Sequence, residues 1–292
     1  MYLPQFHRIP ENDAWWGEGF TEWAAVKAAK PLFEGHIQPN APLEGRYYEL
    51  LDKETVRWQA ELMYQYGVDG ICMYHYWFKD GIRILEKPEQ NLLAWKDIDL
   101  PFCFCWANET WARSWSAFSS EKNTWADTFE PETDNKDDGI LLLQDYGNEK
   151  EWRKHFDYFL PYFLDDRYIK IDGKPVLVIH RVGDISCIDE MLFLFRKEAK
   201  AKGLSGLYII GGECKRDMSN ILDGQLYQEP QHAMGDMGYS SISNIHVYDY
   251  ENVWNHIINT VREYDMQPFF GGFTGYDDTP RRGSEGAVIS GR

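Results

Sequence analysis

Residues 68–77, VDGICMYHYW, and residues 101–109, PFCFCWANE, are built alike: an apolar run is followed at once by aromatic and polar side chains. Short apolar runs bounded by glycine or proline are typical of buried strands. Amphipathic segments with helical spacing lie between such runs. The runs that predict strands are 1–6, 68–74, 101–106, 175–179, 207–210, 225–227 and 268–273, and the predicted helices are 54–66, 152–164, 188–202 and 250–264. This alternation predicts parallel strands joined by helical crossovers.

Two architectures fit the alternation, a doubly wound sheet and a (β/α)8 barrel. The stretch PQFHRIPEN after the first run has no glycine-rich phosphate motif. Polar residues follow many of the runs, as at the active face of a barrel, and 292 residues is close to the barrel's usual length of about 250. We therefore predict a TIM-like (β/α)8 barrel forming one domain over 1–292, with loop insertions at about 7–50 and 110–150. Both ends look truncated, and an eighth strand is expected after residue 292.

The composition narrows the class of partner. Hydrophobic residues make up 43% and charged residues 26%, the mix of a globular protein. The 30 Lys and Arg against 47 Asp and Glu give a net charge of −17, which argues against nucleic acid and anionic membranes. No apolar run reaches the roughly 20 residues of a membrane span. Aromatic residues make up 16%, including 12 Trp and 18 Tyr, which favours a surface that stacks on sugars.

The cysteines predict reduced thiols and no metal. They form no CxxC pair and no histidine-spaced cluster, so a structural zinc site is disfavoured. Most lie in strand-like runs, where a buried thiol is the expected state. We expect no cofactor and no metal, and a cytoplasmic location. The five are Cys72, Cys103, Cys105, Cys187 and Cys214.

The stretch CWANETWARSW (105–115) is the strongest candidate for chemistry. Glu109 directly follows an apolar run among tryptophans, where lost hydration makes a carboxyl hold its proton more tightly and suits it to general acid catalysis. Asn108 is expected to bind a sugar hydroxyl. Alternatively, Glu109 caps a turn or pairs with Arg113 four residues later. The rings predicted to stack here are Trp106 and Trp111.

Two further stretches are rich in aromatic residues: MYHYWF (73–78) lies at a strand end, and WWGEGFTEW (15–23) lies on a glycine-containing loop. Successive side chains on a strand alternate between faces, so only some of the first group can reach a pocket. The second group could form a stacking wall, or an Ω-loop packed by its own rings. The candidate substrate-binding residues are Tyr74, His75, Trp77, Trp15, Trp16, Glu22 and Trp23.

The remaining candidates are polar residues after other strands. TGYDDTPRRG (274–283) offers Asp277, although Asp277 and Asp278 with Arg281 and Arg282 equally suit a local salt bridge. Histidines after strands are often structural. Around a barrel these side chains would nevertheless share one rim. They are His7, His180, Glu213 and Glu229.

The blocks YLPQFHRIPENDAWWGEGFTEWAAV, GICMYHYWF, CWANETW and GYDDTPRRG resemble the WbsX-type family, which is labelled glycosyltransferase and is similar to glycoside hydrolase family 99. The resemblance implies a barrel acting on glycans in bacterial surface polysaccharide metabolism, such as O-antigen, capsule or rhamnan. It also implies a catalytic glutamate pair in an EWxEG segment on the last strand. This sequence contains no EWxEG, so the pair is expected beyond residue 292.

Three functions remain open. The first is a glycosidase or transglycosidase acting on an oligosaccharide or polysaccharide through two carboxylates. The second is a sugar-nucleotide-dependent glycosyltransferase. The third is a glycan-binding module without turnover.

Overall fold

A computed structural model describes residues 1–112, 139–214, 217–260 and 265–291. Within them the protein is a mixed α/β molecule built on one mostly parallel sheet. The short strand β5 (Lys170–Ile171) pairs antiparallel with β6. The parallel strands are β1 (Ile71–His75), β2 (Phe102–Trp106), β6 (Lys174–Ile179), β7 (Tyr208–Gly211), β8 (Gly224–Tyr227) and β11 (Gln267–Phe270).

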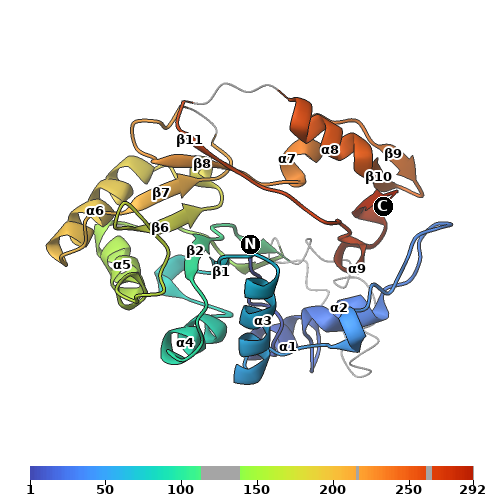
Figure 1. The fold of residues 1–292 in the computed structure, drawn as a ribbon, viewed down its shortest axis with the longest axis horizontal. Coiled ribbons are helices and arrows are strands. Elements are labelled where there is room, and N and C mark those ends of the chain that lie inside the picture. The colour runs from blue at the N-terminus through green and yellow to red at the C-terminus, as the bar shows by residue number, and fades with distance from the viewer. Residues whose placement is uncertain (113–138, 215–216, 261–264, 292) are drawn as a thin grey trace.

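The strands of this sheet lie side by side in the order of the chain, β1-β2-β6-β7-β8-β11 (Figure 1). A doubly wound sheet would reverse its strand order at a switch point. The order observed in the described residues has no reversal, so it agrees with the barrel alternative. The predicted parallel α/β sheet is confirmed. Tyr2 extends the sheet beyond β1 through a parallel bridge to Met73. No bridge joins β11 to the Tyr2 segment within the described ranges, so closure into an eight-stranded barrel stays a prediction.

Helices α3 to α6 follow the outer side of the sheet (Figure 1), as right-handed crossovers between successive parallel strands require. Asp52 caps α3 by accepting from the backbone N–H groups of Glu54 and Thr55. Asn148 and Glu151 form a capping box at the start of α5. The helices are α3 (Lys53–Gln65), α4 (Lys87–Ala94), α5 (Glu149–Phe163) and α6 (Ile188–Ala201), with one-turn 3-10 helices at Leu43–Gly45, Lys79–Gly81, Val182–Asp184 and Gly283–Glu285.

The two faces of the sheet carry different side chains. His75 of β1 and Phe104 of β2 face the helices, and their rings lie 4.8 and 5.8 Å from the ring of Phe159 on α5. Phe104 is fully buried. Tyr74, between two helix-facing residues, points to the opposite face, where a cavity opens. The core therefore lies between sheet and helices, and the inner face is left for ligands.

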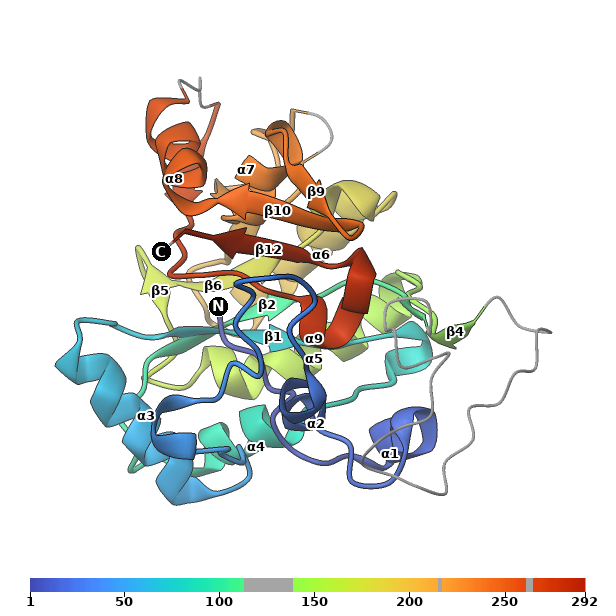
Figure 2. The same cartoon turned by 90° about the vertical axis from the view of Figure 1, so that its right-hand side faces the viewer.

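A smaller unit follows β8 and stands beside the central sheet (Figure 2). Its sheet has the order β12-β10-β9, with β10 parallel to β12 and antiparallel to β9. Tyr248, Val253 and Ile289 form its buried core. The elements are α7 (Gln231–Asp236), β9 (Ser240–Ile242), β10 (Ile245–Asp249), α8 (Tyr250–Asn259), α9 (Thr279–Arg282) and β12 (Ala287–Ser290).

The predicted insertion at 7–50 contains two short helices, α1 (Pro10–Trp16) and α2 (Glu22–Ala28). In the second insertion, β3 (Trp111–Ala112) pairs with β4 (Ile140–Leu142), and 113–138 lies outside the described residues. None of the described helices is long and apolar enough to cross a membrane.

The first insertion is tied to the C-terminal part of the chain. His36 Nε2 lies 2.9 Å from Asp277 Oδ2, and Arg281 of α9 forms an ion pair with Glu22 of α2. These partners are separated by more than 200 positions in the sequence. The segment after β11 therefore fixes the first insertion, residues 7–50, in place.

Candidate active site

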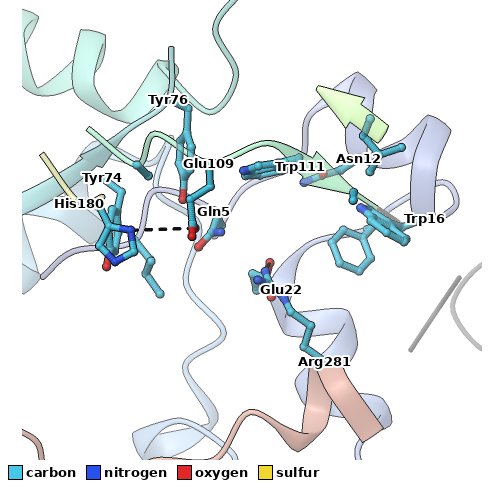
Figure 3. Close-up of a pocket in the computed structure, with 15 residues that line it drawn as sticks. Gln5, Asn12, Trp16, Glu22, Tyr74, Tyr76, Glu109, Trp111, His180 and Arg281 are labelled. Atoms are coloured by element: carbon cyan, nitrogen blue, oxygen red, sulfur yellow. Dashed lines mark hydrogen bonds and ion pairs between the residues drawn. The ribbon is translucent and has the colours of Figure 1, made fainter. Parts of the chain in front are cut away.

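A cavity of about 270 Å³ opens at the carboxyl ends of the parallel strands (Figure 3). One side is formed by residues at the ends of β1, β2 and β6, and the other by α1, α2 and α9. Active sites of parallel α/β barrels lie at this end of the strands. The lining residues are Leu3, Gln5, Asn12, Trp16, Phe20, Glu22, Tyr74, Tyr76, Ala107, Glu109, Trp111, Ala112, Leu141, His180 and Arg281.

Glu109 reaches the cavity from just beyond β2. Its Oε1 accepts a hydrogen bond from Arg181 Nη1 at 2.8 Å, and its Oε2 lies 4.0 Å from His180 Nδ1 (Figure 3). The side chain is 30% exposed, which leaves the carboxylate accessible from the cavity. The partner of Glu109 is therefore the guanidinium of Arg181, two residues beyond the end of β6, whereas the sequence suggested tryptophans or Arg113, which lies outside the described residues.

Arg181 gathers three carboxylates behind the cavity wall. Besides Glu109 it contacts Asp184 at 2.7 Å and Glu213 at 3.4 Å. Partial burial works against the charge of Arg181, but the three carboxylates outweigh it and raise the pKa of the guanidinium. Arg181 is thus a fixed cation that orients Glu109.

Asn108 holds the ends of β2 and β6 together. Its Oδ1 accepts from the backbone N–H of Arg181 at 2.8 Å, and its Nδ2 donates to the Arg181 carbonyl at 2.9 Å and to Tyr146 Oη at 3.2 Å. The side chain is buried and does not line the cavity. The expectation that Asn108 binds sugar is therefore corrected: its amide is already used to position Arg181.

A second carboxylate, that of Glu22, lies across the cavity from Glu109 (Figure 3). It comes from α2 and is paired with Arg281 of α9. The Glu22 charge raises the pKa of Arg281. The cavity therefore has one carboxylate on each side, each held by its own arginine.

Aromatic rings form much of the remaining wall. Trp16 is 8% exposed, and Trp111 packs edge-on against Tyr76 with ring centroids 5.2 Å apart. Burial raises the pKa of the Tyr74 and Tyr76 hydroxyls, so both stay protonated and can donate hydrogen bonds. Rings beside hydroxyls and carboxylates suit the apolar faces and hydroxyl edges of a sugar.

Three predicted aromatic residues, His75, Trp77 and Trp106, lie instead in the core on the helix side. The pleat of β1 sends His75 and Trp77 away from Tyr74, and the pleat of β2 does the same to Trp106. His75 Nδ1 lies 3.1 Å from Glu89 Oε2. The prediction that these rings stack on sugars is wrong for this geometry.

Other predicted residues support the surroundings of the cavity rather than lining it. His7 is buried with its Nδ1 2.7 Å from the Pro4 carbonyl. Trp23 donates to the Tyr48 carbonyl at 2.7 Å, and Trp15 packs 6.2 Å from Trp111. Asp277 and Glu229 are held by polar contacts. Asp277 contacts His36 and Thr279, and Glu229 accepts a hydrogen bond from the backbone N–H of Ala233.

Some lining residues were not among the predicted substrate contacts. Gln5 reaches the cavity from a turn that follows the bridge at Tyr2, so the strand predicted over 1–6 is not formed as such and strand alternation could not have identified Gln5. Asn12 comes from α1, whose helical start at Pro10 did not indicate a pocket. Arg281 was read as part of a local turn, and its pairing with Glu22 required the tertiary structure. Among the described residues, no group of three or more His, Cys, Asp or Glu side chains is arranged to hold a metal ion.

Fold and cavity together are those of a parallel α/β protein with an aromatic, carboxylate-lined site at its strand ends. The chain belongs to the family described as glycosyltransferase WbsX, whose model matches residues 1–292. It is 38% identical over 181 residues to the uncharacterized protein WxcX of two strains of Xanthomonas campestris pv. campestris. That match covers 62% of this chain but only 23% of WxcX, so the chain spans less than a quarter of these relatives.

Three solved structures match this chain at low similarity. Two structures of the GH99 endo-alpha-mannosidase from Bacteroides thetaiotaomicron match 96% of this chain and 70% and 72% of theirs, with TM-scores of 0.46 and identities of 15% and 14%. A glycoside hydrolase-like protein matches 83% of this chain and 68% of its own, with a TM-score of 0.45 and 11% identity.

Proposed function

We propose that this chain is part of a carbohydrate-active enzyme that cleaves or transfers glycosidic bonds in bacterial surface polysaccharide, and that the cavity binds the glycan. The observation that supports this best is the pair of carboxylates, Glu109 and Glu22, facing each other across an aromatic cavity at the strand ends. Glycosidic bond chemistry uses carboxyl groups beside the sugar, and a carboxylate on the opposite wall can hold the sugar by its hydroxyls.

In this proposal Glu109 is the residue that contacts the reacting sugar unit. Its second oxygen is free of Arg181 and lies on the side of His180, so it can accept a hydroxyl hydrogen bond. Trp16 and Trp111 stack on the sugar face, and Glu22 binds hydroxyls opposite. The EWxEG pair implied by the family resemblance is not among residues 1–292.

A sugar-nucleotide-dependent transfer is the second candidate because of the family's description. The negatively charged diphosphate group of a nucleoside-diphosphate sugar needs free cationic groups to bind it. Within the described part of the chain, Arg281 and Arg181 are the arginines at the cavity, and both are engaged by carboxylates. This favours cleavage or transfer between glycans.

The test is an array of bacterial surface oligosaccharides probed with the wild-type chain and with Trp16→Ala. We expect saturable binding that the substitution weakens, and no competition from UDP-, GDP- or dTDP-linked sugars. Tight binding of a sugar nucleotide together with a divalent ion would favour the second candidate. Absence of binding to any glycan would overturn the assignment of the cavity.

A further inference from the structure

A second cavity, of about 540 Å³, lies directly beside the first. Tyr74 and His180 line both cavities and form the boundary between them. The other residues of the second cavity come from the ends of β7 and β8 and from α7. A ligand that fills the first cavity can therefore extend into the second only by passing Tyr74 and His180.

Side-chain amides are prominent in the lining of the second cavity. Gln225 on β8 and Gln231 at the start of α7 both face it, and each amide can donate and accept hydrogen bonds. Gln228 donates to Tyr74 Oη at 3.1 Å, while its own Oε1 is buried with no hydrogen-bond partner in the part of the chain that the structure describes. Groups that both donate and accept match sugar hydroxyls.

The backbone of Glu213 adds an independent sign of a ligand site. Its φ of +42° lies in the left-handed region, which costs energy for a residue with a side chain. A Cβ on the preceding Gly212 would come within 2.4 Å of the His180 carbonyl oxygen, so the chain is fixed at this point. The conformation directs Glu213 into the second cavity while its carboxylate stays 3.4 Å from Arg181. Residues held in such strained backbone conformations are found preferentially at ligand-binding sites.

We propose that the second cavity binds a neighbouring, hydroxyl-bearing sugar unit of the same glycan whose other unit occupies the first cavity. The linkage between the two units then lies over Tyr74 and His180, next to Glu109. This inference rests on the proposed function of the first cavity. It requires that the ligand be at least a disaccharide and that affinity increase with length until both cavities are filled.

The experiment uses a ladder of one to six sugar units prepared from the oligosaccharide that binds most tightly on the array. Affinity is measured by calorimetry for the wild type, for Gln225→Ala and for Gln231→Ala, whose side chains line only the second cavity. Trp16→Ala is the first-cavity control. Because Gln231 is exposed, its replacement leaves folding intact even where Gln225→Ala does not.

We expect wild-type affinity to rise by about tenfold or more between one unit and the longer ligands, the gain from added hydrogen bonds in a second site. The glutamine variants should lose this rise while binding the single unit within about twofold of wild type, and Trp16→Ala should weaken every length. If both glutamine variants keep the full length dependence while single-unit binding is intact, the second cavity is not a sugar site, although the first remains one. If the wild type binds no member of the ladder, the proposed function fails and this inference fails with it.

Discussion

Replacing Glu109 by glutamine keeps the shape of the side chain and removes its charge. Arg181 still contacts Asp184 at 2.7 Å and Glu213 at 3.4 Å. Because Glu109 is 30% exposed, its ion pair resembles a surface pair, worth about 0–1 kcal/mol. A loss of at most about 1 kcal/mol lowers the Tm of a chain this long by no more than about 2–4 °C. We therefore expect Glu109→Gln to fold normally, with only a small shift in a thermal melt.

Its effect on glycan binding should be larger. A hydrogen bond from a sugar hydroxyl contributes about 1.5–3 kcal/mol to a charged carboxylate and about 0.5–1.5 kcal/mol to a neutral amide oxygen, so the substitution should cost about 1–1.5 kcal/mol, or about 5- to 12-fold in Kd. Calorimetry with the best oligosaccharide from the array measures this loss. Asp184→Asn is the matched control, since Asp184 holds the same arginine but does not line the cavity. It should lower the Tm to a similar degree and leave Kd within about twofold. An unchanged Kd for Glu109→Gln, with a lowered Tm, would refute the reasoning and make Glu109 a structural partner of Arg181.

Three further outcomes follow from buried contacts. Asn108→Ala leaves the backbone N–H of Arg181 without its partner, while the Arg181 carbonyl keeps the Asp184 N–H, so urea unfolding should show a loss of about 1–3 kcal/mol, with weaker glycan binding. Burial, and then the neighbouring His75, hold the pKa of His155 well below its ordinary value. The contribution of His155 to the free energy of unfolding is therefore complete above about pH 6.5, and it falls by about 1–1.5 kcal/mol between pH 7 and 5.5. Urea unfolding of His155→Gln should lack this one-proton dependence. Gly212→Ala puts a methyl group 2.4 Å from the His180 carbonyl oxygen and should lower both the Tm and glycan affinity, whereas Gly238→Ala, where nothing lies within 4 Å and which lines neither cavity, should leave affinity unchanged.

The sheet could be predicted from sequence because each strand is a local signal. The run FCFCW at Phe102–Trp106 alternates large rings with small thiols, and the structure puts the rings against the helices and the thiols on the inner face. Side chains in β1 also alternate between the two faces, so the sequence showed that not all of its aromatic residues can reach the pocket. It could not say which ones do, because Tyr74 and His75 are equally plausible until the partner helix is known.

The opposite wall of the cavity could not be predicted, since it depends on contacts between distant parts of the chain. Glu22 and Arg281 are 259 positions apart. In the sequence, Arg281 stands three residues after Asp278 and reads as a turn partner. Only the path of the chain from β11 back to α2 shows that Arg281 holds a cavity carboxylate (Figure 1).

These two walls differ in how they are held, and that difference bears on the chemistry. Glu109 and His180 follow strand ends that Asn108 joins through two backbone hydrogen bonds, so their positions are set by the most rigid part of the fold. Glu22 lies on a short helix within a long connection and is fixed mainly through its arginine. Groups that must meet reacting atoms within a fraction of an ångström are best placed on rigid elements. Under the proposed function, the geometry therefore favours Glu109 over Glu22 for contact with the linkage, with Glu22 holding the sugar.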